Sequence, residues 1–236
     1  SKVAEKYGKT DDAQILAKHA KNYQLVFDNE TKSMRGRYIN GTWSPDYNPT
    51  ARASYLTEGT PLQHMWFVPQ DVPGLFDLIG DKKLVHEKLD ELFSTGEYWH
   101  ANEPCHHIPY LYNFLGDYAS TQKTVKNIMA SEYNNFDGGI PGNDDSGQMS
   151  AWYAFSAMGF YPVSPGSGEY QVSSPVFNEV KLNLNPKYYP GGKFTISQSD
   201  PDTYKTFSKV ELDGTEIPFV LKHEDIRKGG KLKFSN

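Results

Sequence analysis

The sequence predicts a mainly α-helical fold followed by a β-rich C-terminal segment. Over residues 1–160, apolar side chains recur at helical spacing between long polar loops. Over residues 161–236, apolar and polar side chains alternate, as they do in half-buried strands. The helix–loop–helix rhythm recurs without an internal sequence repeat, which favours stacked helical hairpins, as in an α/α toroid.

The first helix is predicted from Asp11 and Asp12, which suit a helix start, through apolar positions that continue to Phe27. The Gly-, Asn- and Pro-rich stretch 27–49 then predicts a loop. Residues 55–65 indicate a second helical segment, which Pro69 ends.

Two helices are predicted next. Residues 71–80 indicate a short helix with Pro73 in its first turn. Asp81 suits the N-cap of a longer helix that ends before Gly96, with one apolar face formed by Val85, Leu89, Leu92 and Phe93.

The later part of the chain is predicted to change from helix to strand. Residues 121–133 and 147–158 have helical spacing, and Gly159 suits the end of the second of these helices. Alternation in 179–184 and 194–196 predicts strands, and Asp213-Gly214 predicts the tight turn of a hairpin. Residues 223–234 are expected to form a further turn and strand.

Composition excludes several classes of protein. The net charge is −5 and the basic residues are dispersed, so we expect no nucleic-acid or anionic membrane partner. No apolar run is long enough for a membrane-spanning helix. Cys105 is the only cysteine, which excludes an internal disulfide and a Cys-based zinc site. Both ends of the chain indicate a fragment of a longer protein.

The chain is rich in aromatic residues, with 16 Tyr, 13 Phe and 4 Trp. Such residues build cores, but Tyr and Trp also line polar ligand clefts. An aromatic-rich core and a carbohydrate site are both compatible with this composition.

Three polar loops are candidates for chemistry, since functional residues concentrate on loops. The first contains Glu58 in an apolar sequence setting that includes Trp66. Burial there would raise the pKa of the carboxyl, as a general acid requires. A solvated surface Glu is the alternative.

The second loop, 96–109, contains His100, Asn102, Glu103 and the neighbouring His106 and His107. Its His spacing matches no common zinc signature, so we expect hydrogen-bonding residues of a cleft or of a helix start. The third loop, "GGIPGNDDSGQMSAWY", places Asn143, Asp144 and Asp145 before a helix. Helix capping explains one of the two acids, and a catalytic or calcium-binding role explains the set.

Three motifs together resemble the calcium-dependent exo-α-mannosidases of glycoside hydrolase family 92. They are "EGTPLQHMWFVPQDVPGL", "NEPCHHIPYLYNF" and "GGIPGNDDSGQMSAWYAFSAMGFYPVSPGSGEYQVSSPVF", with "RGRYINGTW" and "HEDIRKGGKLKF" fitting the same pattern. The resemblance implies an N-terminal β-sandwich, absent here, and a C-terminal (α/α)6 barrel. Residues 1–160 would be part of that barrel, and residues 161–236 its β-rich C-terminal segment.

The same resemblance implies inverting, Ca²⁺-dependent hydrolysis of terminal α-mannosides of glycans, above all α-1,2 linkages as in N-glycan processing. It implies Glu58 as general acid, and Asp145 with Asp144 as the acids that position and deprotonate water. Asn102, Glu103, His106 and Trp66 would bind substrate. Glu103, Asn143 and Asp145 would bind calcium.

The family cleft also uses the N-terminal domain, so we expect that missing domain as a partner. The resemblance further implies a bacterial periplasmic, secreted or cell-surface location. Two other functions stay open. One is a non-catalytic carbohydrate-binding or scaffold module, and the other is an α/α-barrel hydrolase of another sugar linkage.

Overall fold

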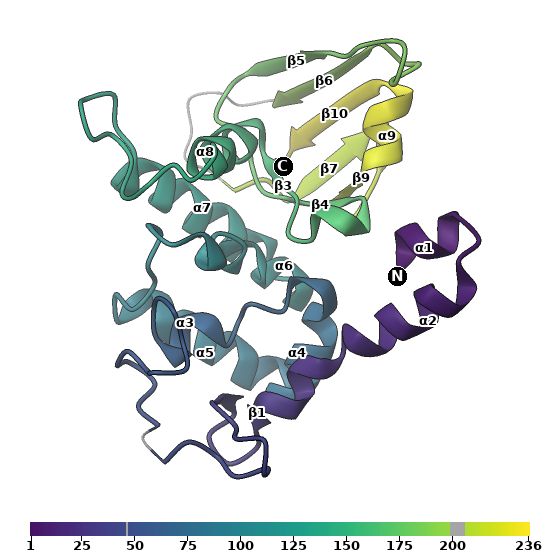
Figure 1. Ribbon diagram of the computed structural model, residues 1–236. Coiled ribbons are helices and arrows are strands. Elements are labelled where there is room, and N and C mark those ends of the chain that lie inside the picture. Colours follow the sequence, from purple (N-terminus) through teal and green to yellow (C-terminus); the bar gives the residue numbers. More distant parts are fainter. Residues whose placement is uncertain (46, 199–205) are drawn as a thin grey trace. The chain divides into compact units, whose positions relative to one another are not determined.

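The computed structural model describes residues 1–45, 47–198 and 206–236; Asp46, within the predicted loop 27–49, lies outside the described residues. The chain divides into two compact units, Ser1–Cys105 and His106–Asn236 (Figure 1). It is a mixed helical and sheet structure. None of the helices in the described ranges has the length and apolarity needed to cross a membrane.

The first unit begins with two exposed helices, α1 (Lys2–Lys6) and α2 (Thr10–His19), which contain no buried residue. The sequence analysis did not predict α1. The prediction that the next helix continues to Phe27 is wrong. A short 3-10 turn, η1 (Asn22–Val26), follows α2, and Phe27 begins a two-stranded ribbon of β1 (Phe27–Asp28) and β2 (Ser33–Met34).

A partly buried anchor at Asp71 explains why α2 ends early. The Lys21 ammonium and the Tyr23 hydroxyl both donate to Oδ2 of Asp71, each at 2.6 Å. Burial raises the pKa of the Asp71 carboxyl, but these two hydrogen bonds outweigh burial and lower it. The segment after α2 is therefore held to the start of α4 rather than continuing as a helix.

The prediction of a helical segment over 55–65 is correct only for its end. Helix α3 covers Pro61–His64, with Thr60 as its N-cap in an extended conformation. Pro61 lacks an N–H and disfavours helical geometry at the preceding residue, so residues 55–60 cannot continue the helix. The Thr60–Gln63 capping box then fixes its start.

The core of the first unit lies between α4 (Val72–Ile79) and α5 (Lys82–Ser94), as predicted. The Asp81 side chain accepts a hydrogen bond from the Leu84 N–H at 2.9 Å and caps α5. Two 3-10 turns flank these helices, η2 (Pro69–Asp71) and η3 (Glu103–Cys105). The fully buried apolar side chains of α4 and α5 are Leu75, Ile79, Val85, Leu89 and Leu92.

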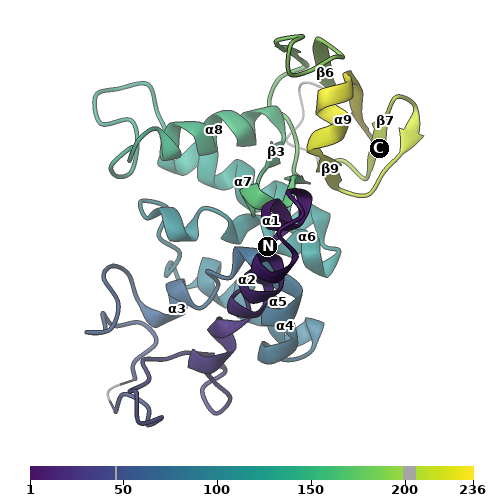
Figure 2. The same ribbon diagram turned by 45° about the vertical axis from the view of Figure 1, so that its right-hand side comes forward.

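The second unit begins with helices and continues into sheets. Two long helices, α7 (Tyr118–Glu132) and α8 (Gln148–Met158), pack side by side (Figure 2). Both confirm the predicted spacing, and Gly159 ends α8 in a left-handed conformation. The short elements η4 (Ile108–Tyr110) and α6 (Tyr112–Leu115) precede α7.

Two sheets complete the second unit. The smaller sheet has the antiparallel order β3-β4-β9, from Phe160–Tyr161, Glu169–Val172 and Val220–Lys222. The larger sheet has the order β5-β6-β10-β7-β8, from Glu179–Asn183, Lys193–Gln198, Gly230–Ser235, Lys209–Leu212 and Thr215–Glu216. Strand β10 is parallel to β6 and antiparallel to β7. The 3-10 turn η5 (Pro165–Ser167) precedes β4.

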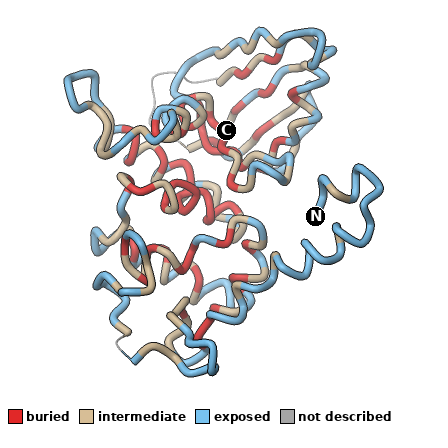
Figure 3. The backbone as a smooth tube through the Cα atoms, in the orientation of Figure 1, coloured by how far each residue is buried: buried red, intermediate tan, exposed pale blue. Residues whose placement is uncertain are grey.

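Buried and less buried residues alternate along strands of the larger sheet (Figure 3). One face of the sheet therefore lies in the core. Phe194 and Ile196 of β6 and Leu232 and Phe234 of β10 are fully buried. The predicted hairpin is confirmed, because Asp213-Gly214 joins β7 to β8 with both φ angles positive, 50° and 81°.

Residues 223–234 contain more than the predicted turn and strand. His223–Lys228 form a short helix, α9, before β10. The second compact unit also spans residue 160 without interruption. The predicted boundary after residue 160 therefore marks the change from helix to strand. That it is also a domain boundary stays a prediction.

Gln122 connects the helices of the second unit to its sheet. This fully buried side chain accepts a hydrogen bond from the Phe207 N–H at 2.8 Å and donates one to the Phe207 carbonyl at 2.9 Å. Two backbone groups just before β7 therefore depend on one side chain of α7.

We expect Gln122→Ala to lower the free energy of unfolding by about 2 kcal/mol, because it leaves two buried backbone groups without partners. Urea unfolding followed by circular dichroism measures the loss. The matched control is Lys123→Ala, at the neighbouring exposed position on the same helix. If both variants unfold at the same urea concentration, Gln122 does not connect α7 to the sheet in the way described.

Candidate active site

The predicted site residues fall in both compact units, and each group is described within its own unit. Glu58, Trp66, Asn102 and Glu103 belong to the first unit. His106, Asn143, Asp144 and Asp145 belong to the second.

Glu58 lies in the turn that leads into α3, and its side chain is exposed. The expected apolar setting is therefore wrong in this structure, because Pro61 ends the preceding segment as a turn that faces solvent. The turn itself is well fixed. The His64 ring donates from Nε2 to the Glu58 carbonyl, and Gly59 has φ +71° with Gln63 and His64 packed against it.

Gln63 fixes the Glu58 turn to the loop that carries the second motif. Its Oε1 accepts from the Thr60 N–H at 3.0 Å, and its Nε2 donates to the Glu97 carbonyl at 2.7 Å. Helix α3 also packs against η3, which begins at Glu103. The first unit thus brings the segments of Glu58 and of Asn102-Glu103 next to each other.

Asn102 presents a buried donor. The residue is 2% exposed, its carbonyl accepts from the Cys105 N–H at 2.9 Å, and its Nδ2 has no hydrogen-bond partner in the described part of the chain. A buried amide donor without a partner costs free energy, which a ligand acceptor would offset. Glu103 beside it is half-buried.

Trp66 and Cys105 are buried beneath these loops. Both side chains are completely buried, so the Trp66 ring packs in the core of the first unit rather than presenting a face to solvent. Burial raises the pKa of the Cys105 thiol to about 12, which keeps it protonated and unreactive.

In the second unit, Asp144 caps α8. Its Oδ1 accepts from the Ser150 N–H at 2.8 Å, and its Oδ2 accepts from the Ser150 hydroxyl at 3.0 Å. Both carboxylate oxygens are therefore bound to the first turn of the helix, where the helix dipole also favours negative charge. Capping thus accounts for one of the two acids.

Asp145 has a different environment. Its side chain is exposed and has no hydrogen bond or ion pair with any other described residue. Asp145, Ser146 and Gly147 are consecutively left-handed, with φ of 42°, 60° and 89°. Such a backbone is unfavourable for residues with a Cβ and is found at functional sites. The connection between α7 and α8 extends away from both helices (Figure 1).

His106 is bound to the start of α8. The residue is 1% exposed, its Nδ1 accepts from Gln148 Nε2 at 3.3 Å, and its carbonyl accepts from Trp152 Nε1 at 2.8 Å. Accepting at Nδ1 places the ring proton of the neutral imidazole on Nε2. Gln148 Nε2 also lies 3.0 Å from the Tyr161 hydroxyl.

The donor chemistry of these loops fits calcium better than zinc. No group of three or more His, Cys, Asp and Glu that could hold a metal forms among residues 1–45, 47–198 and 206–236. Calcium sites also use amide and backbone oxygens, and the Asn143 amide, the Asp145 carboxylate and the loop carbonyls supply such oxygens. His100, His106 and His107 are all buried, as expected of residues that line a cleft or lie at a helix start.

The sequence analysis missed two residues that organise the site, Ser150 and Gln148. An N-cap Asp normally binds an N–H two or three residues later, whereas Asp144 reaches six residues ahead. The left-handed run 145–147 makes that reach possible. Its only sequence signal is Gly147, directly before the helix.

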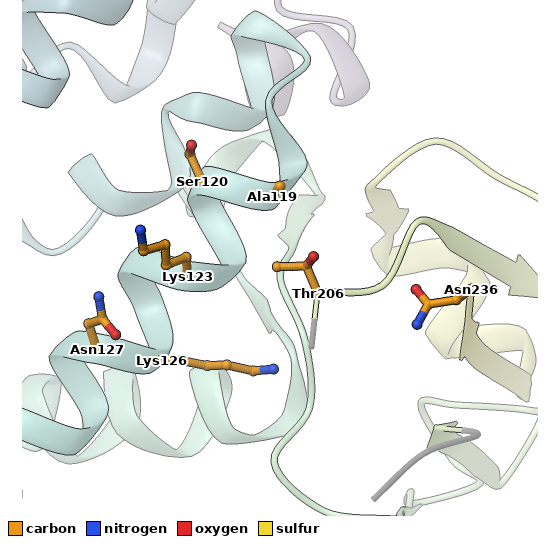
Figure 4. A pocket seen from close by; sticks show the side chains of 7 residues that line it. All are labelled: Ala119, Ser120, Lys123, Lys126, Asn127, Thr206 and Asn236. Carbon is orange, nitrogen blue, oxygen red and sulfur yellow. The ribbon is translucent and has the colours of Figure 1, made fainter. Parts of the chain in front are cut away.

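One cavity of the second unit has a lining of different chemistry. It has a volume of about 520 Å³ and is lined, among the described residues, by Ala119, Ser120, Lys123, Lys126, Asn127, Thr206 and Asn236. Lys126 points from α7 towards Thr206, while Lys123 and Asn127 point the other way (Figure 4). Burial lowers the pKa of Lys126. Among the described residues its lining contains two lysines and no acidic side chain, so this cavity does not present the pair of carboxyl groups that glycoside hydrolysis uses.

We expect Asp144→Ala to lower the free energy of unfolding by about 1 kcal/mol, because it removes the cap of α8. Asp145→Asn is the matched control, and we expect it to change stability by less than about 0.5 kcal/mol, since its side chain has no partner to lose. Chemical denaturation of both variants makes the comparison. Equal losses would show that the two acids share one structural role.

Comparisons with known proteins give the family. The family model described as the glycosyl hydrolase family 92 catalytic domain matches residues 1–235. The family GH92 α-mannosidase BT3965 from Bacteroides thetaiotaomicron is 39% identical, with a TM-score of 0.90 over 98% of this chain and 32% of that one. The inverting mannosidase BT2199 from the same organism is 33% identical, with a TM-score of 0.89 over 98% of this chain and 34% of that one.

A curated relative, described as an uncharacterized secreted glycosidase of Arthroderma benhamiae, is 30% identical over 157 residues, which are 62% of this chain and 20% of that protein. The chain thus spans about a third of the length of the solved relatives and a fifth of the curated one. Because the family model covers nearly all of the sequence, the chain belongs to glycosyl hydrolase family 92.

Proposed function

We propose that this chain carries the acid and base carboxylates of an inverting, Ca²⁺-dependent exo-α-mannosidase that releases terminal mannose, with α-1,2 linkages as the first choice. One observation carries the proposal. In a chain of glycosyl hydrolase family 92, Asp144 is fully bound to α8 while its neighbour Asp145 is held exposed on a left-handed backbone.

Asp145 is the base in this proposal. A general base must accept a proton from water at a free carboxylate oxygen, and both oxygens of Asp144 already accept hydrogen bonds from Ser150. Asp145 would orient a water molecule towards the anomeric carbon and take its proton as the glycosidic bond breaks. In inverting glycosidases the acid and base carboxyl groups stand roughly 6.5–9.5 Å apart, which leaves room for that water.

Glu58 is the acid in this proposal. Its turn is fixed by His64 and Gln63, so the carboxyl extends from a rigid support. A sugar placed over this exposed carboxyl would bring its glycosidic oxygen within hydrogen-bond reach of the acid. Protonated Glu58 would then donate to the glycosidic oxygen as the leaving group departs.

Substrate binding is assigned to Asn102, Glu103 and His106. The buried Nδ2 of Asn102 has no partner within the described residues, and a sugar hydroxyl is a suitable acceptor. Glu103 adds acceptor oxygens, and the proposed Nε2–H of His106 adds a donor. We infer that Trp66 supports these loops from the core, since its ring is fully buried.

Calcium is proposed as the cofactor, with oxygen ligands from Glu103, Asn143 and Asp145. When bound, Ca²⁺ would orient and polarise hydroxyls of the terminal mannose. The residues themselves would position the sugar and move the two protons.

The full-length protein supplies the remaining context of the proposal. We infer that the helices of this chain form part of an (α/α)6 barrel, and that an N-terminal domain of the same protein completes the cleft. The description of the Arthroderma relative as secreted supports an extracellular or periplasmic location. Glycans with terminal α-mannose are the proposed substrates.

We expect Asp145→Asn and Glu58→Gln each to lower kcat of the full-length protein by roughly 10²–10⁴-fold, because each removes one proton transfer. Release of mannose from α-1,2-mannobiose measures the loss, and NMR of the first product identifies the anomer. A matched control is Glu132→Gln, at the C-terminal end of α7. Full activity of Asp145→Asn would contradict the base assignment, and an initial α-anomer would contradict inversion.

We expect EDTA to abolish mannose release and CaCl2 to restore it, whereas MgCl2 restores little, because Mg²⁺ keeps its waters and demands strict octahedral geometry. The measurement is the initial rate at increasing free metal concentration. Rates that do not change in EDTA would contradict a calcium requirement. If folded protein binds mannosides but never cleaves them, the chain belongs to a non-catalytic binding module. If it cleaves other glycosides instead, the sugar or linkage assignment is wrong.

A further inference from the structure

A second hollow of the second unit lies beside the connection between α7 and α8. It has a volume of about 630 Å³ and uses none of the predicted site residues. Three aromatic rings, two side-chain amides and one serine hydroxyl define it, from Tyr133, Phe136, Tyr153, Asn134, Asn135 and Ser150.

The inner wall of this hollow is rigid. The Tyr133 hydroxyl donates to the Met149 carbonyl at 3.2 Å. The Tyr133 ring stacks on Trp152, with centroids 5.9 Å apart and 3° between the planes, and packs against Tyr153 with centroids 4.9 Å apart. These contacts fix the Tyr133 ring before any ligand binds, which lowers the entropic cost of binding.

The outer wall is a tight turn that presents Phe136. The Asn134 N–H donates to the Gly139 carbonyl at 3.0 Å, and the Phe136 N–H donates to Asn134 Oδ1 at 3.0 Å. A Cβ at Gly139 would lie 2.2 Å from the Asn134 carbonyl oxygen, so the turn requires glycine there. The Phe136 ring is nevertheless 78% exposed, on a backbone that is held in place.

The lining selects a class of ligand. None of the described residues in it has a charged side chain, so a neutral ligand fits better than an ion. Aromatic rings can cover the apolar C–H face of a pyranose, while amides and a hydroxyl can donate to and accept from its hydroxyl groups. Pockets of a few hundred Å³ with apolar walls and a few placed polar groups are typical small-molecule sites.

We propose that this hollow is a second carbohydrate subsite, which binds a neutral hexose unit of the glycan other than the one that is cleaved. The inference rests on the proposed glycosidase function and extends it to substrates of several sugars. Ser150 lines the hollow and also binds both oxygens of Asp144, so the subsite adjoins the loop that presents Asp145.

The test compares substrates of increasing length in the full-length protein, with α-1,2-mannobiose, -triose and -tetraose as probes. We expect Phe136→Ala and Asn135→Ala to lower kcat/KM for a longer probe, relative to that for mannobiose, by roughly three- to tenfold through a higher KM. Phe177→Ala is the matched control, since Phe177 is also an exposed phenylalanine of the second unit and lies outside the hollow. Melting temperatures verify that each variant is folded.

The decisive quantity is kcat/KM for a longer probe divided by kcat/KM for mannobiose. If Phe136→Ala and Asn135→Ala give the same value as Phe177→Ala, the subsite proposal is overturned. If the protein hydrolyses none of these probes, the proposed linkage fails, and binding of mannotetraose by calorimetry then tests the subsite alone. Binding that is weakened by Phe136→Ala but not by Phe177→Ala supports it. Absent binding, or binding that Phe136→Ala leaves unchanged, overturns it.

Discussion

The carboxylate of Asp144, bound to both the N–H and the hydroxyl of Ser150, is the interaction on which the α7–α8 connection depends. It spans six residues, so the chain between them must fold back within three left-handed residues. That backbone costs free energy, which the two charge-assisted hydrogen bonds offset. The bound acid therefore makes possible the exposed position of its neighbour, Asp145. Two adjacent residues of identical chemistry thus have separate roles, one structural and one proposed to be catalytic.

Much of the fold follows from local sequence signals. The cap at Asp81, the period of 121–133 and the Asp213-Gly214 turn each specify their element within a few residues, and each prediction was confirmed. The predictions that were wrong depend on longer-range contacts or on proline. Helix α2 ends early where Lys21 and Tyr23 reach Asp71, 50 and 48 residues away in sequence, which no local pattern encodes. Pro61 did carry a local signal, its effect on the preceding residue, and it fixes the start of α3.

The sequence proposes the residues of the candidate site, but it does not predict their environments. The sequence identified Glu58, Asp144 and Asp145 as candidates, yet it expected Glu58 in an apolar setting, and the structure exposes it. Hydrophobic neighbours along a chain say little about burial when a turn directs them away from the acid. The distinction between Asp144 and Asp145 was also out of reach. It depends on Ser150, a residue whose type has no distinctive signal inside a helix.

The order of strands in the larger sheet has a consequence for how the protein is made. Strand β10 lies between β6 and β7, although it follows every other strand in sequence. Until the ribosome has released Gly230–Ser235, the β5-β6 pair and the β7-β8 hairpin have no strand to join them. Apolar residues of both pairs, such as Phe194 and Val210, would stay exposed during synthesis and favour contacts between nascent chains. The larger sheet is therefore completed only after β10 has been synthesised, and a chain that stops before β10 would leave it open.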